Sequence, residues 1–519
     1  MSRGLVVLFL VAAVLGAGTL AAATPPAPVT LREALAVSQR LGPVRASAPI
    51  HVAIAFRKLD PALVRPALAS ARLANLRTSW TPGDGIAFLN GSAGSIDRFF
   101  GVRLTRYRMP GGREFFTGDH EAVLRPALRK IVDGVAGLDD FGQLGVAAIR
   151  PGGLTPSDVL SFYDISALRA RGLDGTGETV VFPELTSPGD VPTLRQDLAY
   201  YATKYNLPPF DLTVRSDSAW HPLATDDSYG ESALSEAALD LEIVHAIAPK
   251  AKLVIYTEGR GYVDGIAAEL AMVREHPTAV ISDSIGGCEL GISSASALKV
   301  VDAPWDRQAQ ENMTHFAASG DSGAYDCGQN HQAAVDFPSD LPTVTAVGGT
   351  TVFETTSGAY GREVVWGDPL AEAGGGGGIT QLYKRPDYQH GPGITAGSAR
   401  LVPDVSAVAD WHTGWYVRAG GADHQVGGTS AAAPLWAGVA ALIDQDLVAS
   451  HLRRIGLANP ALYWIGQRNG TLRAFHDITV GNNLLYVAHA GWDNATGWGT
   501  PDAAALDAAW KTYIRTGGT

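Results

Sequence analysis

The segment GGTSAAAP, Gly427–Pro434, and the apolar run that follows it through Leu442 form the most informative stretch of this sequence. Glycines before the serine allow a tight turn, and small residues after it allow a helix to begin close to neighbouring backbone. A helix N-terminus also stabilises developing negative charge. The same pattern is typical of a serine that only caps a helix. Ser430 is therefore either a helix cap or a nucleophile, and the rest of the sequence decides between the two.

Around this segment, from Thr155 onward, short apolar runs alternate with helical patterns. This alternation predicts an α/β fold, a doubly wound parallel sheet with helices on both faces. Catalytic groups in such folds lie at the carboxyl ends of the strands. The Gly374–Gly378 run is expected to form a flexible surface or cleft loop. The expected strands are Thr179–Phe182, Lys252–Tyr256, Ala279–Ile285, Thr314–Ala318 and Thr343–Val347, and the expected helices include Ala238–Ala248 and Asp264–Glu275.

The region before this alternation, residues 24–150, predicts a separate small α+β domain. Ile50–Phe56 alternates like a strand and Pro61–Leu73 like a helix. Gly111 and Gly112 lie between two strand-like runs and indicate a hairpin. The stretch Gly137–Pro156, rich in Gly and Asp, indicates a linker to a second domain, residues 151–519.

The N-terminus has the pattern of a cleavable signal peptide, residues 1–23. Arg3 precedes an apolar run from Leu5 to about Leu20, and Ala21-Ala22-Ala23 provides the cleavage site. A membrane anchor is the alternative, because the run is just long enough to span. We expect export, with no membrane association after cleavage.

Bulk composition limits the classes of protein. A chain of 519 residues exceeds one ordinary core. A net charge of −12 argues against nucleic acid or an anionic membrane as the main partner. Cys288 and Cys327 are the only cysteines, and each follows an expected strand end. In an oxidising compartment such a pair forms a disulfide more often than not, and their spacing matches no zinc site.

A pair of carboxylates stands out on the expected helix around residue 238. Glu236 and Asp240 lie four residues apart, on one helical face. Alone, such a pair is usually part of a solvated face. The apolar residues around it indicate instead that the helix is buried, and two buried carboxylates at this spacing share a proton.

Together with the serine segment, this pair resembles the sedolisins, the family of serine-carboxyl peptidases with a subtilisin-like catalytic domain. The resemblance implies that Ser430 is the nucleophile, Glu236 the base for the serine, and Asp240 the residue that orients the base. A subtilisin acting at neutral pH would instead need a His-Gly-Thr-His segment, which this sequence lacks.

The segment Ala317–Gly323 (AASGDSG) carries a third match, Asp321, after an expected strand. An isolated Gly-Asp-Ser-Gly is typical of a turn. The resemblance implies that Asp321 donates a hydrogen bond into the oxyanion hole, where subtilisins have Asn. A carboxyl group donates only when protonated. A carboxylate base also stays usable at about pH 4, where histidine is protonated. Both replacements therefore predict activity in acid.

The resemblance extends to one structural calcium ion near the C-terminus, since all-oxygen ligation suits a hard cation. It also matches Glu184 to a residue that extends the carboxylate network, although Ile285 replaces a Trp that can complete it. Asp336 matches a residue near the substrate cleft, and a turn role is equally open. The implied calcium ligands are Asp477, Asp493 and the carbonyls of Ile478, His489 and Gly491.

We therefore expect a secreted, acid-acting endopeptidase, made as a self-processing proenzyme and monomeric. Its N-terminal domain would be a ferredoxin-like prodomain that serves as intramolecular inhibitor and chaperone, and its substrates would be proteins or peptides. The alternative from another class is an inactive secreted binding protein on the same scaffold. Retention of Ser430, Glu236, Asp240 and Asp321 speaks against it.

Overall fold

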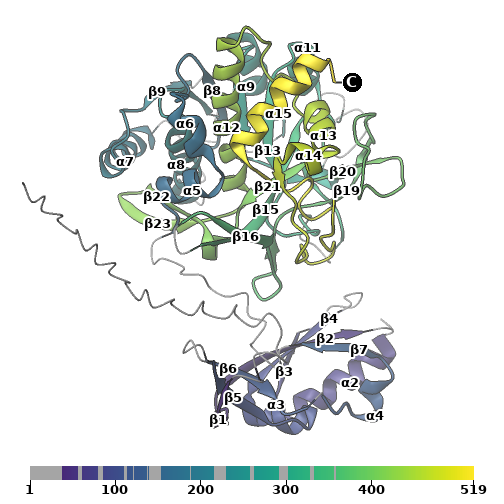
Figure 1. Ribbon diagram of the computed structural model, residues 1–519. Helices are drawn as coiled ribbons and strands as arrows, with labels where there is room; N and C mark the ends of the chain where they lie inside the picture. The colour runs from purple at the N-terminus through teal and green to yellow at the C-terminus, as the bar shows by residue number, and fades with distance from the viewer. Residues whose placement is uncertain are drawn as a thin grey trace, which may run out of the picture. The chain divides into compact units, whose positions relative to one another are not determined.

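The chain divides into two compact units, Met1–Gly145 and Val146–Thr519, which are described separately (Figure 1). The expected signal peptide and most of the expected linker lie outside the described residues. The computed structural model describes residues 35, 38–56, 61–79, 86–109, 114–120, 122–136, 138, 153–186, 189–215, 230–257, 262–291, 298, 302–327, 332–355 and 358–518.

The first unit contains a four-stranded antiparallel sheet in the order β3-β4-β2-β7. Helix α2 follows β2 and α3 follows β4, and their apolar side chains share one core with the sheet. This order of strands and helices is ferredoxin-like. The elements are β2 (Pro49–Phe56), α2 (Pro61–Leu73), β3 (Arg77–Ser79), β4 (Ile86–Ser92), α3 (Ala93–Phe100), α4 (Pro126–Arg129) and β7 (Val132–Ala136).

A second, three-stranded sheet of this unit has the order β1-β5-β6. Strands β5 (Leu104–Arg108) and β6 (Glu114–Gly118) form the antiparallel hairpin that the two glycines predicted. Strand β1 (Gln39–Pro43) pairs with β5 on its other side.

The second unit is built on an eight-stranded sheet in the order β16-β15-β13-β11-β8-β10-β9, with β21 paired to β15. All its pairs are parallel except β15 with β16. The predicted doubly wound α/β fold is therefore confirmed for this unit. Its strands are β8 (Thr179–Glu184), β9 (Asp211–Arg215), β10 (Lys252–Thr257), β11 (Val280–Asp283), β13 (Thr314–Ala318), β15 (Thr345–Glu354), β16 (Tyr360–Val365) and β21 (Val405–Val408).

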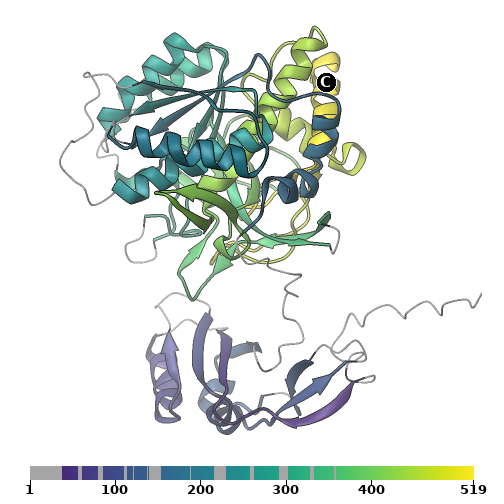
Figure 2. The same cartoon turned by 90° about the vertical axis from the view of Figure 1, so that its left-hand side faces the viewer.

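Helices cover both faces of this sheet (Figures 1 and 2). On one face, α8 (Gly230–Ile247) and α12 (Thr429–Ala449) pack against each other, and α15 (Ala503–Thr516) packs on α12. On the other face, α9 (Tyr262–Glu275) contributes Ala268, Ala271 and Met272 to a separate apolar layer. Other helices of the unit are α5 (Pro156–Phe162), α6 (Ile165–Ala170), α7 (Val191–Lys204), α11 (Ala303–Gln310) and α13 (Asn459–Gly466).

Helix α12 is the most deeply buried helix, and its burial explains its apolar sequence. Within the described part of the chain it is the one helix long and apolar enough to span a membrane, yet 89% of that stretch is buried inside the protein. Burial of this kind is typical of a core helix. Because α12 is enclosed by the sheet and by α8, the residue at its N-terminus has a fixed position.

Candidate active site

Ser430 is the second residue of α12, and the structure makes the preceding Gly428 necessary. Gly428 has a φ of +93°, a backbone conformation that residues with a Cβ rarely adopt. A Cβ at this position would also lie 2.6 Å from Asp321 Oδ2. The close approach of Gly428 to Asp321 therefore brings the serine segment and the loop after β13 together.

Glu236 and Asp240 lie on α8, on the side that faces Ser430. Burial raises the pKa of Glu236 to about 7; a hydrogen bond with the Ser430 hydroxyl acts in the opposite direction, and the charge of Asp321 adds to the rise. Asp240 is fully buried, and its pKa lies well above the ordinary value, first because of burial and then because of the charge of Glu236. The serine hydroxyl and the two carboxyls thus form one site.

Glu184, the last residue of β8, extends this row of carboxyls. It is fully buried, and burial followed by the charges of Asp240 and Glu236 raises its pKa well above the ordinary range. Both Glu184 oxygens, Asp240 Oδ2 and Glu236 Oε1 are buried and accept no hydrogen bond from the described residues. Protons held on these carboxyls would satisfy the oxygens, because a protonated carboxyl donates to its neighbour.

Asp321 lies directly after β13 and contacts the residue that precedes the nucleophile. Its Oδ1 accepts hydrogen bonds from the Thr429 backbone N–H at 2.6 Å and the Thr429 hydroxyl at 2.9 Å. The side chain remains exposed at the edge of the site. The protein around the carboxyl raises its pKa by desolvation, whereas the bonds from Thr429 lower it.

The Gly374–Gly378 run corrects one expectation. It is not a flexible surface loop: these residues are buried, and they pack against the segment that carries Asp321. The Gly376 N–H donates to the Gly320 carbonyl at 2.7 Å, and a Cβ on Gly376 would lie 1.9 Å from the Ser319 carbonyl oxygen. The glycines are needed because two backbone segments touch here, a reason that composition alone does not reveal.

Asp336 lies beside a second acid, Asp326, near Asp321. Burial and then the charge of Asp321 raise the pKa of Asp336 to about 7. Burial and then the charge of Asp336 place the pKa of Asp326 well above its ordinary value. Asp326 Oδ1 accepts from the Ser322 N–H at 2.8 Å, which fixes the loop after Asp321.

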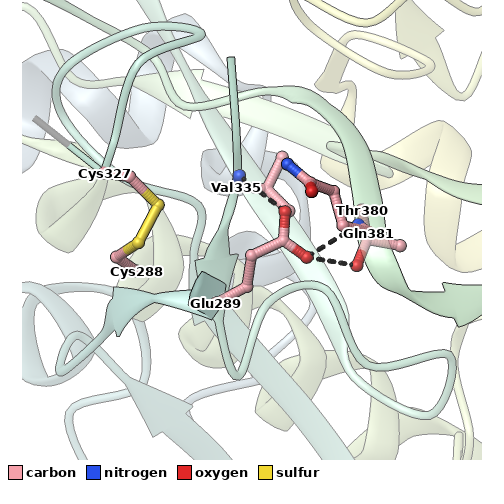
Figure 3. The surroundings of a disulfide bond; sticks show 6 residues. All are labelled: Cys288, Glu289, Cys327, Val335, Thr380 and Gln381. Atoms are coloured by element: carbon pink, nitrogen blue, oxygen red, sulfur yellow. Dashed lines mark hydrogen bonds between the residues drawn. A yellow bond between two sulfur atoms is a disulfide. The ribbon is translucent and has the colours of Figure 1, made fainter. Parts of the chain in front are cut away.

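A disulfide joins Cys288 to Cys327, with 4.7 Å between the Cα atoms (Figure 3). It connects β12 (Gly287–Cys288) to the loop that carries Asp321 and Asp326. Beside it, the buried Glu289 carboxyl accepts from the Val335 N–H at 3.3 Å, the Thr380 hydroxyl at 2.7 Å and the Gln381 N–H at 2.8 Å (Figure 3). One wall of the site is therefore tied together covalently and by hydrogen bonds.

The predicted calcium ligands lie together in the C-terminal loops, held at their base by β24 (Phe475–His476) and β25 (Thr500–Pro501). The Gly491 N–H donates to Asp477 Oδ2 at 2.9 Å, and the His489 N–H donates to Asp493 Oδ2 at 3.0 Å. Two carboxylates thus converge on one short segment, and Asp493 is buried. Carboxylate and backbone oxygens are the donors that calcium prefers, so these residues fit the ion.

Three residues of the site escaped the sequence reasoning: Ser284, Asp326 and Glu289. The Ser284 hydroxyl lies 2.8 Å from Asp240 Oδ1. Asp326 and Glu289 are each adjacent in sequence to a cysteine of the disulfide, which was the one available signal.

A serine at the N-terminus of the core helix of a doubly wound sheet, with acids at the strand ends, defines a serine peptidase of the subtilase class. In agreement, the model of the Subtilase family matches residues 226–499. The acidic partners of the serine and the relatives of the chain narrow the class further. The chain belongs to the sedolisin family of serine-carboxyl peptidases.

Two curated relatives match most of the chain. Kumamolisin from Bacillus sp. (strain MN-32) is 33% identical over 451 residues, 80% of this chain and 77% of that protein. Sedolisin from Pseudomonas sp. (strain 101) is 28% identical over 460 residues, 83% of this chain and 75% of that protein. A solved structure of Pseudomonas sedolisin, complexed with two molecules of pseudo-iodotyrostatin, covers 71% of this chain and 99% of its own at 28% identity, with a TM-score of 0.61.

Proposed function

We propose that this chain is a secreted, acid-acting endopeptidase, synthesised as a proenzyme that processes itself. The observation that carries the proposal is the group beside the nucleophile. The partner of Ser430 is the carboxyl of Glu236, hydrogen-bonded to the serine hydroxyl, and not a histidine. A carboxyl base remains usable in acid, where an imidazole is protonated.

The reaction is acyl transfer to Ser430 followed by hydrolysis. Ser430 Oγ attacks the peptide carbonyl carbon while its proton passes to Glu236, and Asp321, protonated, donates to the oxyanion. When the C–N bond breaks, Glu236 returns the proton to the leaving amine. Water then attacks the acyl-enzyme with Glu236 again as base, and Asp240 holds Glu236 in place throughout. These roles rest on the contacts of Glu236 and Asp321 with the serine segment and on the position of Asp240 beside Glu236.

The pKa values support an optimum in weak acid. Catalysis needs Glu236 ionised and Asp321 protonated, so the two groups together hold one proton. Burial raises the Glu236 pKa to about 7, and desolvation also raises the Asp321 pKa above its ordinary value. The state with one proton is populated between the two pKa values, whichever group carries the proton. The optimum therefore lies between the pKa values of these two carboxyl groups.

Secretion and the proenzyme form are parts of the same proposal. The apolar N-terminal run supports export, and the Cys288–Cys327 disulfide suits an oxidising compartment. The separate ferredoxin-like unit before the catalytic unit is the proposed prodomain, which would act as inhibitor and folding aid until it is cleaved.

The test is a digest of a peptide library by the purified protein at about pH 4, with Ser430→Ala as the control and the products identified by mass spectrometry. We expect internal cleavages that the variant does not produce. If the products are instead N-terminal fragments of fixed length, the protein is an exopeptidase and the proposed endopeptidase action is wrong. No products at any pH, with a folded protein, would favour the inactive binding protein.

We also propose one structural calcium ion, held by Asp477, Asp493 and the carbonyls of Ile478, His489 and Gly491. Bound calcium would neutralise the two carboxylates, whose pKa values burial raises. A metal that binds only the folded state stabilises it by mass action. Chelation or Asp493→Ala should therefore lower the melting temperature, measured by scanning calorimetry across a calcium titration. A melting temperature independent of calcium would remove the site from the proposal.

A further inference from the structure

Ser284 is the first residue after β11, and its side chain lies between two parts of the site. The hydroxyl oxygen is 2.8 Å from Asp240 Oδ1 and 3.2 Å from the backbone carbonyl oxygen of Ser430. Asp240 lies on α8, and Ser430 lies on α12. One hydroxyl thus connects the helix that carries the acids to the helix that carries the nucleophile.

The contact with Ser430 follows from a proline in the sequence. In an α-helix the carbonyl of residue i accepts from the N–H of residue i+4. For Ser430 that residue is Pro434, which lies within α12 and has no N–H. The Ser430 carbonyl therefore lacks its usual helical donor, and the Ser284 hydroxyl is placed to supply one. An unpaired carbonyl here would loosen the first turn of the helix, where the nucleophile lies.

The contact with Asp240 depends on the protonation of that acid. A hydroxyl has one hydrogen, so Ser284 can donate to only one of its two neighbours at a time. With Asp240 ionised, the hydrogen goes to Asp240 Oδ1. With Asp240 protonated, Asp240 can donate to Ser284 Oγ, which leaves the serine hydrogen for the Ser430 carbonyl. Both contacts are hydrogen bonds together in the protonated form of the site.

The turn that presents Ser284 is held from the other face of the sheet. Asp283 Oδ1 accepts from the Ile285 N–H at 2.9 Å, across Ser284. Asp283 Oδ2 lies 3.5 Å from Nε2 of His315 on β13, and both side chains are buried. His315 Nδ1 in turn lies 2.8 Å from Gln308 Oε1. A buried polar chain therefore fixes the backbone on both sides of Ser284.

We propose that Ser284 is a positioning residue of the peptidase reaction: its hydroxyl ties the Asp240 carboxyl to the first turn of the helix that carries Ser430. Ser284 acts through these two residues and does not itself touch the reacting atoms. The proposal rests on the roles proposed above for Ser430 and Asp240.

The first test compares Ser284→Ala with Ser282→Ala. Ser282 lies two residues earlier, on β11, and its buried hydroxyl has no hydrogen-bond partner among the described residues, so both changes remove the same atom. We expect Ser284→Ala to lower kcat about tenfold, the scale of one hydrogen bond, with KM nearly unchanged. Ser282→Ala should leave kcat unchanged. Ser284→Thr, which keeps the hydroxyl, should restore most of the rate.

The second test is a double-mutant cycle with Pro434→Ala. An alanine at this position provides the N–H that the Ser430 carbonyl lacks in the natural sequence. Ser284→Ala should then lower the melting temperature less in the Pro434→Ala background than in the natural one. The loss of kcat should persist in both backgrounds, because alanine at this position does nothing for Asp240. Melting effects that simply add would show that Ser284 does not serve the Ser430 carbonyl.

The proposal is overturned if Ser284→Ala and Ser282→Ala have the same kcat, or if Ser284→Thr is as slow as Ser284→Ala. If Ser284→Ala does not fold, Ser284→Thr and Ser284→Val provide a pair of equal shape with and without the hydroxyl. All rates are compared with the natural protein at its own optimum. If the natural protein has no activity, the proposed function is wrong. If the natural protein is active but substitutions of Ser284 do not change kcat, only this inference is wrong.

Discussion

At the scale of single residues, the proposed mechanism requires Glu236 and Asp321 to have opposite protonation states in one site. Glu236 must be ionised to accept the Ser430 proton, and Asp321 must be protonated to donate to the oxyanion. Desolvation by the surrounding protein raises the pKa of both, to about 7 for Glu236. The proposed mechanism therefore predicts that activity falls toward neutral pH as the last shared proton is lost.

Asp321→Asn should abolish this alkaline loss, because an amide donates at every pH. The rate should then rise through the Glu236 pKa and level off. The variant should be slower at the optimum, since a misplaced oxyanion donor costs about 10²–10³ in rate. The measurement is kcat/KM from about pH 3 to about pH 8, the range in which carboxyl groups and histidine titrate. If the pH profiles of kcat/KM for the natural protein and Asp321→Asn superimpose after scaling, Asp321 does not cause the loss of activity at high pH.

The sequence allowed some of these residues to be predicted because their neighbours in the chain are informative. Ser430 follows two glycines and precedes a core helix, and Glu236 and Asp240 share a helical face. Ser284 has no such context. Its importance arises from contacts with residues 44 and 146 positions away in the chain, and only folding brings them together.

At the scale of elements, the disulfide is the strongest constraint on the loop that carries Asp321. It closes a loop with a sequence separation of 39 between Cys288 and Cys327. A cross-link of this length stabilises by about 4 kcal/mol on the chain-entropy model. Replacing both cysteines with serine should lower the free energy of unfolding by this order and also reduce kcat, since the loop that carries Asp321 is released. Denaturant titration and kinetics measure the two effects, and natural protein treated with a reductant serves as the control. If neither the double serine variant nor the reduced natural protein is less stable than the oxidised natural protein, the disulfide does not stabilise this loop.

The secondary-structure elements differ in how well the sequence pattern predicted them. The central strands β8, β10, β11 and β13 were predictable because strands buried on both faces are apolar runs. The edge strand β9 (Asp211–Arg215) has the sequence DLTVR and is partly exposed, so it carries no such signal. Helix α8 spans Gly230–Ile247, so it begins N-terminal to the apolar stretch Ala238–Ala248 that indicated it.

For the whole molecule, the proposed self-processing involves both units of the chain. If the catalytic unit removes the N-terminal unit, Ser430→Ala should remain a full-length proform in acid. The natural protein should shorten under the same conditions, as seen by gel electrophoresis and N-terminal sequencing of purified samples. Addition of a trace of active natural enzyme to the variant separates cleavage within one molecule from cleavage between molecules. Maturation of purified Ser430→Ala without added enzyme would contradict autocatalysis.

The buried acids also set how the stability of the whole molecule depends on pH. Glu363 accepts hydrogen bonds from Tyr163 and Thr350, at 2.8 and 2.7 Å, yet burial raises its pKa from 4.5 to about 7. Burial also raises the pKa of Asp444 to about 7. An acid with a raised pKa binds more protons in the folded than in the unfolded state between its ordinary and its raised value. Its contribution to stability is therefore complete in acid and is lost as the pH rises through that window.

Histidines act in the opposite direction. Burial lowers the pKa of His245 from 6.5 to about 4, so its contribution is lost as the pH falls through that window. His276 and His476 are lowered for the same reason. The acids should outweigh them, because Glu184, Asp240 and Glu242 are raised as well, each well above its ordinary value. The molecule as a whole should be more stable in weak acid than at neutral pH.

We therefore predict a melting temperature that falls as the pH rises from about 4.5 to about 7.5, the reverse of the acid lability that ionised, paired carboxylates produce. Scanning calorimetry of the Ser430→Ala protein in excess calcium measures it without self-digestion. Glu363→Gln should flatten the dependence, since each proton bound differently by the two states changes the free energy of unfolding by about 1.4 kcal/mol per pH unit. Asp174→Asn is the matched control, because the pKa of Asp174 is lowered to about 2 and its effect lies below this range. A melting temperature that rises toward neutral pH would contradict this prediction, because it would show that the protonated buried acids do not outweigh the groups that stabilise the protein as the pH rises.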